Sequence, residues 1–362
     1  MSTHRIALLP GDGIGVDVVR EGQLVLDTLA QATGAMRWDM QEFPWSCDYY
    51  LEHGQYMPDD ALDILDGFDA ILYGACGLPD VVPDEVSQHQ GVLRVRQGFE
   101  LYVNLRPARL LPGLPTPLAG KGPGDFDLLC VRENSEGEYA GCGGRVHQGS
   151  SYEVALQTTV FTREGVERII RYAFDMTQRL GRRHVTNVTK SNALQFAPVF
   201  WDEVFEEVAA EYPGITTDRN LVDAAAARMV SSPETFDVLV ASNLFGDILS
   251  DIGGALMGSL GVPASANINP EGAHPPMFEP VHGSAPDIAG QGIASPIATI
   301  WAASMMVEHL GHPEEAELVM GALGDVTASG VLTPDLGGDA TTTECGAAVR
   351  DALRARAASA AA

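Results

Sequence analysis

Three aspartates in largely apolar segments suggest a metal site. Asp247 and Asp251 are four residues apart in FGDILSDIGG, so their side chains would share one face of a helix. A solvated acidic face would also explain this spacing, but the intervening residues are apolar, serine or glycine. Carboxylate oxygens are the ligands that Mg²⁺ and Mn²⁺ prefer. The sequence therefore predicts a divalent-cation site at Asp247 and Asp251, with Asp223 in LVDAAAARM as a third ligand.

The next candidate is a lysine in a chain that nearly always uses arginine. The 22 basic residues include only two lysines, Lys121 and Lys190, and Lys190 ends an expected strand in VTKSN. Arginine keeps its proton at any workable pH, whereas a lysine with a lowered pKa can accept one. Lys190 is therefore a candidate general acid–base, the alternative being an ordinary surface lysine. Tyr139, in EGEYAG, is either a buried proton donor or a packed aromatic.

Three arginines form another candidate group. Arg96 and Arg106 lie in LRVRQGFELYVNLRPAR, and Arg132 lies in CVRENSEGEY. Arg106 precedes a proline and should therefore have an extended backbone. Guanidinium groups bind carboxylates through paired hydrogen bonds, so three of them close together would suit a dicarboxylate. Scattered surface ion pairs are the alternative in so acidic a chain.

Two glycine-rich segments are candidate nucleotide contacts. In RIALLPGDGIGVDVV the glycines at 11, 13 and 15 follow a strand pattern, but G-x-G-x-x-G spacing, a clear ribose-binding carboxylate and a P-loop lysine are all missing. The segment 279–296, EPVHGSAPDIAGQGIASP, offers many backbone N–H groups to phosphate or adenine. Asp287 there would bind ribose hydroxyls and repel a 2′-phosphate, which favours NAD over NADP.

Strand-like and helical runs alternate along the chain and place these candidates near element ends. The expected strands are 5–10, 68–74, 127–133, 184–190 and 236–243, and the expected helices are 16–31, 196–212, 245–260, 295–310 and 340–361. This alternation predicts an α/β protein with a substantially parallel sheet. A β-branched stretch, 153–161, follows a glycine-rich segment and predicts a projecting hairpin arm.

Composition excludes several classes of protein. The 362 residues are 45% hydrophobic and 20% charged, which suits a globular chain with a sizeable core. A formal net charge of −27 argues against a nucleic-acid partner, whose phosphates require clustered Lys and Arg. The longest apolar runs are too short to predict a membrane span. Five cysteines without a C-x-x-C pair are typical of reduced thiols, so we expect a cytoplasmic protein.

Six separated segments together resemble one family. PGDGIG, NLRP, VRENSEGEY, VTKSN, ASNLFGDILSD and EPVHGSAPDIAG occur in this order within residues 5–355. They resemble the β-decarboxylating dehydrogenases (the isocitrate/isopropylmalate dehydrogenase family), and segments such as SCDYYLEHG and PLAGKGPGD resemble its tartrate/D-malate branch. The resemblance implies an α/β, isopropylmalate-dehydrogenase-like two-domain fold with a mixed central sheet, not a Rossmann fold. It implies a large cofactor-side domain, 1–105 and 263–362, and a small domain, 106–262, with a dimer-clasping arm near 137–161.

The resemblance also implies a reaction. It is the NAD-dependent, divalent-metal-dependent oxidative decarboxylation of a small 2-hydroxy dicarboxylic acid: D-malate to pyruvate and CO₂, tartrate, or both. The metal is Mg²⁺ or Mn²⁺, and a requirement for a monovalent cation such as K⁺ stays open. Lys190 would take the hydroxyl proton as hydride passes to NAD, and Tyr139, or a water that it orients, would protonate the enol left by CO₂.

Site residues and partners follow from the same motif match. The substrate carboxylates would be held by Arg96, Arg106 and Arg132, and the metal by Asp223, Asp247 and Asp251. The cofactor contacts would be Asn192, His282, Gly283, Ser284, Ala285, Asp287 and Ser295. The chain would form a homodimer or a dimer of dimers, in which Lys190 and Asp223 enter the active site of the partner chain.

Two departures from the family pattern bear on specificity. Ser295 stands where relatives usually have Asn, and QHQ at 88–90 stands where tartrate and D-malate relatives usually carry a Leu-Trp step. A 3-isopropylmalate dehydrogenase is the alternative, but its substrate needs an apolar wall ahead of Arg96, and a lost apolar contact changes discrimination by about 1–3 kcal/mol. The polar residues there favour a small polar substrate. A non-catalytic subunit of the same fold is disfavoured, because the acid–base and metal candidates are all present.

Overall fold

The computed structural model describes residues 2–361 and divides the chain into two compact units. The first unit contains the residues up to Leu101, Pro107–Asp125 and the residues from Gly253 onward. The second contains Tyr102–Arg106 and Phe126–Ile252. Compared with the predicted boundaries, residues 107–125 and 253–262 thus belong to the first unit instead of the small domain, and residues 102–105 belong to the second unit. The division into a cofactor-side and a substrate-side domain stays a prediction.

The first unit is built on five neighbouring strands in the order β2-β1-β3-β12-β11. β1 pairs in parallel with β2 and β3, β12 pairs in parallel with β3, and β11 is antiparallel to β12. The strands are β1 (Ser2–Gly11), β2 (Met36–Glu42), β3 (Ala70–Ala75), β11 (Ala264–Ile268) and β12 (Met277–Pro280). The sheet is therefore mixed, as predicted, and its order differs from the Rossmann order.

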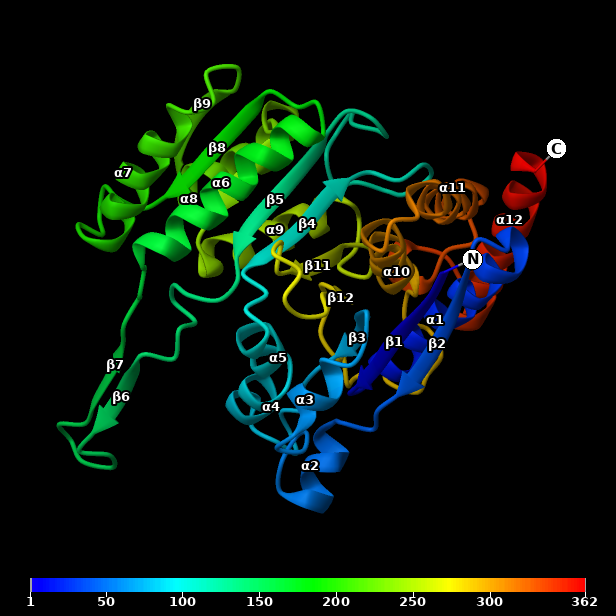
Figure 1. The fold of residues 1–362 in the computed structure, drawn as a ribbon, viewed down its shortest axis with the longest axis horizontal. Helices are drawn as coiled ribbons and strands as arrows, with labels where there is room; N and C mark the ends of the chain where they lie inside the picture. Colours follow the sequence, from blue (N-terminus) through cyan, green and yellow to red (C-terminus); the bar gives the residue numbers. More distant parts are fainter. Residues whose placement is uncertain (1, 362) are drawn as a thin grey trace. The chain divides into compact units, whose positions relative to one another are not determined.

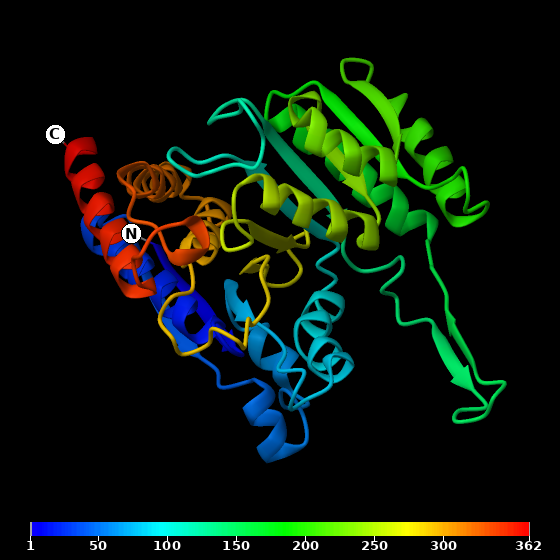
Figure 2. The same ribbon diagram turned by 180° about the vertical axis from the view of Figure 1, so that it is seen from behind.

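Long helices bury the core of the first unit. The sequence of α10 (Ile297–His309) has no charged residue before Glu308, and most of its residues are buried, as expected for a helix that is apolar all round. α1 (Gly15–Thr33) and α12 (Thr342–Ala360) pack side by side in both ribbon views (Figures 1 and 2). The remaining helices are α2 (Cys47–His53), α3 (Ala61–Leu65), α4 (Asp84–Gln90), α5 (Val92–Gly98), α11 (Pro313–Ser329) and the short η2 (Pro334–Leu336).

The second unit contains five neighbouring strands in the order β4-β5-β10-β8-β9, of which β4 continues into the first unit at Pro107. β10 pairs in parallel with β5 and β8, and β8 pairs in parallel with β9. The strands are β4 (Val103–Arg109), β5 (Asp127–Glu133), β8 (His184–Thr189), β9 (Thr216–Leu221) and β10 (Val238–Ala241). β10 reads VLVA and is wholly buried, as expected for a central strand covered on both faces. The helices are α6 (Arg163–Arg179), α7 (Ala197–Ala209), α8 (Val222–Ser231), η1 (Pro233–Thr235) and α9 (Asn243–Leu256), whose last turn, from Gly253, belongs to the first unit.

A thin hairpin extends from the second unit (Figure 1). Its antiparallel strands are β6 (Gly143–Val146) and β7 (Val154–Gln157), and all eight strand residues are exposed. The sequence predicted a hairpin arm in this region, and its second strand proves shorter than the expected stretch 153–161.

No helix described in residues 2–361 combines the length and apolar character needed to cross a membrane. The five cysteines are free thiols, as predicted.

Candidate active site

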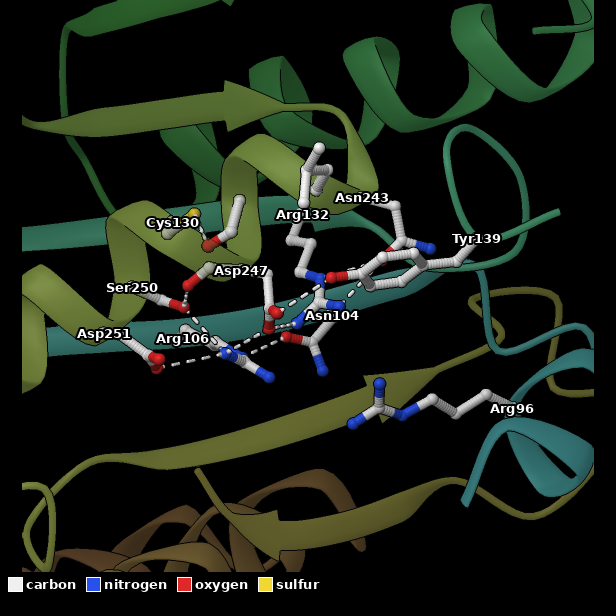
Figure 3. Close-up of polar contacts among 12 residues, drawn as sticks. Arg96, Asn104, Arg106, Cys130, Arg132, Tyr139, Asn243, Asp247, Ser250 and Asp251 are labelled. Atoms are coloured by element: carbon white, nitrogen blue, oxygen red, sulfur yellow. Dashed lines mark hydrogen bonds and ion pairs between the residues drawn. The ribbon is translucent and has the colours of Figure 1, made fainter. Parts of the chain in front are cut away.

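Asp247 is the centre of a charged cluster in the second unit (Figure 3). Its Oδ1 accepts a hydrogen bond from Arg132 Nη1 and another, 3.3 Å long, from Arg106 Nη1. Its Oδ2 accepts a hydrogen bond of 3.1 Å from the Tyr139 hydroxyl. Asp251 Oδ1 lies 4.0 Å from Arg106 Nη1. The structure thus brings together two predicted substrate residues, one predicted proton donor and two predicted metal ligands.

The sheet explains why residues so far apart in sequence meet here. Arg132 lies near the end of β5 and pairs in register with Ala241, the last residue of β10. α9 begins two residues later, so its first turns lie beside Arg132. A glycine at 246 permits this approach, since a Cβ there would lie 2.7 Å from the Arg132 side chain. Asp247 and Asp251 are one helical turn apart and share a face of α9.

Glu138 holds the beginning of α9 in place. Its carboxylate accepts hydrogen bonds from the Leu244 backbone N–H (3.2 Å) and from the Ser242 hydroxyl (3.1 Å). Free N–H groups and the positive end of the helix dipole favour a carboxylate at this position. Because Glu138 precedes Tyr139, the same contact fixes the segment that presents the phenol to Asp247.

Asparagines orient the two arginines of the cluster. Arg106 Nε donates to Asn104 Oδ1 at 2.8 Å, and Arg132 donates to Asn243 Oδ1 through Nε at 3.1 Å and Nη2 at 2.7 Å. All four side chains are buried. Neither asparagine was among the predicted site residues, although both lie inside the NLRP and ASNLFGDILSD segments. Their position two residues before Arg106 and four before Asp247 was the available signal.

Partial desolvation and like charge act together on Asp251, whose side chain is 57% exposed. Desolvation raises the pKa of its carboxyl, and the neighbouring Asp247 raises it further, while Arg106 and Arg132 oppose the shift. Two carboxylates on one helix face repel each other, and a hard divalent cation bound between them would relieve this repulsion. The pair therefore fits the predicted metal.

Tyr139 is held in its protonated form. Desolvation first, and then the charge of Asp247, raise the pKa of its phenol above the ordinary value of 10.0. The Arg132 guanidinium lies 5.8 Å from the centre of its ring. A phenol in this setting remains a proton donor at neutral pH.

Lys190 and Asp223 form a separate ion pair in the same unit. Lys190 follows β8 and Asp223 lies in the first turn of α8, which follows β9, so the two residues meet at the same ends of two parallel strands. The hydrogen bond from Lys190 lowers the pKa of the Asp223 carboxyl. Among residues 2–361 no three His, Cys, Asp or Glu side chains are grouped to hold a metal. The chain by itself therefore does not join Asp223 to Asp247 and Asp251.

Arg96 is buried in the first unit, where it pairs with Glu279. Its Nη2 lies 2.5 Å from Glu279 Oε1, and that oxygen also accepts a hydrogen bond of 2.8 Å from Asn267. Within residues 2–361, the Arg96 Nε has no hydrogen-bond partner. Sequence analysis missed Glu279, although it is the first residue of EPVHGSAPDIAG.

The glycine turn after β1 is a site of close backbone packing. A Cβ at Gly11 would lie 1.9 Å from the Ala75 carbonyl oxygen, and one at Gly13 would lie 2.0 Å from the Ser284 carbonyl oxygen. The Ile14 N–H donates to that Ser284 oxygen at 2.9 Å. The turn is thus bonded directly to the loop that we expected to bind the cofactor.

Asp12, inside the glycine turn, is a buried organising residue that sequence analysis missed. Its carboxylate accepts hydrogen bonds from the Tyr56 hydroxyl (2.8 Å) and from the backbone N–H groups of Cys47 and Gly77 (both 2.7 Å). The Cys47 thiol lies 3.3 Å away and donates as well. One carboxylate therefore ties the turn to three separate segments.

The predicted cofactor loop has one buried polar atom to which no described residue supplies a hydrogen bond. His282 Nε2 is buried and unpartnered, and burial lowers the pKa of this imidazole, which stays neutral. Asp287 is exposed, whereas Ser284 and Ser295 are buried. An unpartnered buried nitrogen beside the glycines fits a nucleotide that would supply its hydrogen bond.

The other predicted cofactor residues have no such buried polar atom. Gly283 is exposed, and Ala285 has a φ of 39° at the bend of the loop. Asn192 lies in the second unit, on the exposed segment after Lys190.

Comparison with known proteins is consistent with this geometry. Residues 5–349 match the isocitrate/isopropylmalate dehydrogenase family. The chain is 51% identical to the probable tartrate dehydrogenase/decarboxylase of Bacillus subtilis, over 95% of this chain and 96% of the relative. It is 51% identical to the D-malate dehydrogenase [decarboxylating] of Escherichia coli, over 96% and 98%. The isocitrate dehydrogenase structure from Methylococcus capsulatus superposes with a TM-score of 0.85, at 39% identity over 97% and 99% of the two chains.

Proposed function

The chain belongs to the isocitrate/isopropylmalate dehydrogenase family and is a decarboxylating dehydrogenase, and from this premise we propose its substrate and cofactors. It oxidises and decarboxylates a small 2-hydroxy dicarboxylic acid with NAD: D-malate, to give pyruvate and CO₂, tartrate, or both. The observation that carries the proposal is the pair of buried guanidiniums, Arg106 and Arg132, beside two carboxylates on one face of α9.

The arginines bind and orient the diacid. Arg106 and Arg132 are fixed by buried neighbours, so little side-chain entropy is lost when a carboxylate binds. Arg96 is the third carboxylate-binding residue of the proposal. Fixed guanidiniums hold the substrate in one orientation and provide much of the rate enhancement through positioning.

Two residues move protons. Lys190, in its neutral amine form, accepts the proton of the substrate hydroxyl. Before the substrate enters, the ion pair with Asp223 holds this side chain in place. Tyr139, whose phenol stays protonated, returns a proton to the carbon that loses CO₂. When bound, NAD accepts the hydride and a divalent cation polarises the hydroxyl and carboxylate oxygens.

Two groups of residues hold the metal and the NAD. Asp247 and Asp251, with Asp223, hold Mg²⁺ or Mn²⁺, and K⁺ is a further cation to be tested. NAD is held by Asn192, His282, Gly283, Ser284, Ala285, Asp287 and Ser295. Because Asp287 is exposed and negatively charged, it accepts ribose hydroxyls and repels a 2′-phosphate, so NAD is preferred over NADP.

The partner is a second copy of the chain, in a dimer or a dimer of dimers. Tyr152 and Leu156 of the hairpin are 67% and 63% exposed, and Phe196 is 79% exposed in the same unit. A two-stranded hairpin is marginally stable alone, and such exposed apolar groups favour packing on a partner. In this assembly Lys190 and Asp223 complete the active site of the other protomer. We also assign the enzyme to the cytoplasm.

A substrate panel tests the proposal. Purified protein with NAD and either Mn²⁺ or Mg²⁺, with and without K⁺, is assayed on D-malate, tartrate and 3-isopropylmalate. We expect NADH formation with D-malate or tartrate, with kcat/KM at least tenfold above that for 3-isopropylmalate. Dominant activity on 3-isopropylmalate, or equal use of NADP, would overturn the assignment.

A further inference from the structure

We infer that Asn104 and Asn243 are positioning residues that set both the orientation and the net charge of the diacid site; the inference rests on the proposed function. Each amide oxygen faces the Nε side of one guanidinium, Asn104 on Arg106 and Asn243 on Arg132. The asparagines are 0% and 2% exposed, so these bonds are protected from water.

Each hydrogen bond to an asparagine Oδ1 fixes the orientation of the guanidinium that donates it. A guanidinium has five N–H donors in one plane, and an acceptor at Nε leaves the far Nη edge to bind other groups. Arg106 Nη1 donates a hydrogen bond of 2.7 Å to Ser250 Oγ and another to Asp247. Arg132 Nη1 likewise donates a hydrogen bond to Asp247. Both arginines therefore direct an Nη group toward the carboxylate face of α9.

The charge balance of the cluster explains why a neutral amide, and not a carboxylate, suits these two positions. Arg106 and Arg132 carry two positive charges, and Asp247 and Asp251 carry two negative charges when ionised. A divalent cation raises the total to two positive charges, which matches a dianionic substrate. A carboxylate in place of either asparagine would accept the same hydrogen bond but would remove one of those charges. An amide supplies the acceptor and leaves the charge unchanged.

The test substitutes each asparagine in two ways and measures binding of two ligands of opposite charge. Asn104→Asp and Asn243→Asp keep the acceptor and add a negative charge, whereas Asn104→Leu and Asn243→Leu remove the acceptor at similar volume. The diacid probe is succinate, which has no hydroxyl to oxidise, measured by titration calorimetry with Mn²⁺ present. Binding of Mn²⁺ alone is measured from the EPR signal of the free ion.

We expect the Asp variants to respond in opposite directions to the two ligands. Succinate affinity falls about tenfold, while Mn²⁺ affinity is equal to or higher than that of the unaltered protein. The Leu variants lose succinate affinity without gaining Mn²⁺ affinity. NAD affinity is unchanged in the Asp variants, because the charge is added at the diacid site only.

Gln178→Glu is the matched control. It makes the same amide-to-acid change on the exposed end of α6, just before β8 begins, whereas the cluster lies where β5 and β10 end. This variant should bind both ligands normally. Unchanged succinate affinity in both Asp variants, or a parallel loss of succinate, Mn²⁺ and NAD binding, would overturn the inference. If the unaltered protein binds succinate but does not turn over D-malate or tartrate, the proposed substrate fails while the role of the asparagines is still measured.

Discussion

At the scale of single residues, the environment of each carboxyl decides its role. Asp247 is bonded to two guanidiniums and a phenol, while Asp251, one helical turn away, lies at 4.0 Å from its nearest guanidinium nitrogen. Partial desolvation and the charge of Asp247 raise the pKa of Asp251. Asp251 therefore gains most when a bound cation offsets the charge of the neighbouring carboxylate.

This difference predicts how metal binding depends on pH. A cation binds the ionised carboxylate, and because the pKa of Asp251 is raised, protons compete at a higher pH than they would at an ordinary aspartate. We expect Mn²⁺ affinity to fall as the pH is lowered. The fall should begin at a higher pH than it would for an aspartate with the ordinary pKa of 3.8. Asp251→Asn should weaken Mn²⁺ binding roughly tenfold or more and remove this component of the pH dependence. Free-Mn²⁺ EPR across a pH series measures both, and unaltered affinity in the variant would exclude Asp251 as a ligand.

At the scale of elements, a polar network joins β8, β9 and α8, the elements next to Lys190 and Asp223. Asp218 Oδ1 lies 2.8 Å from His184 Nε2, and Asp218 Oδ2 accepts a bond of 2.7 Å from Arg228. Desolvation of Asp218 opposes its ionisation, but the hydrogen bonds from Arg228 and His184, together with the nearby Thr186 hydroxyl, outweigh it and lower its pKa to about 2. Arg228 lies in α8, so the network anchors the helix that carries Asp223.

The lowered pKa predicts a loss of stability in acid. A carboxyl with a depressed folded-state pKa stabilises the protein above its unfolded value of 3.8, and this contribution disappears as the pH falls to about 2. Allowing for partial solvent screening, the contribution is about 1–2 kcal/mol. We therefore expect the free energy of unfolding, measured with urea at a series of pH values, to fall less between pH 4 and 2 in Asp218→Asn than in the unaltered protein. Parallel curves for the two proteins would contradict the role of Asp218.

At the scale of the whole molecule, the described chain separates groups that one reaction needs together. Lys190 and Asp223 pair with each other, apart from the cluster of Asp247, Arg106 and Arg132. The proposed second copy would bring these two groups into one site. An assembly with shared sites has a property that a monomer lacks, because two defective chains can together form one intact site.

Complementation between inactive variants is therefore expected. Lys190→Ala and Asp251→Asn each damage one half of the shared site, so each homodimer should lose at least a hundredfold in kcat. Refolding the two together as an equal mixture should produce heterodimers with one intact site each. We expect recovery of about a quarter of the unaltered activity, since half of the dimers are mixed and each has one of two sites intact. Recovery no greater than the sum of the separate variants would show that all site residues come from one chain.

The sequence by itself determined the elements and the types of residue that do chemistry. The runs around β1, α1, β5, β8 and β10 are apolar with regular spacing, and such local patterns depend only on neighbours in the chain. Motif resemblance then gave the family, the mixed sheet and the candidate residues, because these properties are carried by short contiguous segments.

Only the tertiary structure decided the partners of those residues. Arg106 and Asp247 are 141 positions apart, and Arg96 and Glu279 are 183 apart, so no local pattern could reveal either pair. The same reason explains why Asp12, Asn104 and Asn243 were missed, since a buried acceptor is recognised by the donors that the fold brings to it. The separation of Asp223 from Asp247 is likewise a consequence of strand order, in which β8 lies between β10 and β9.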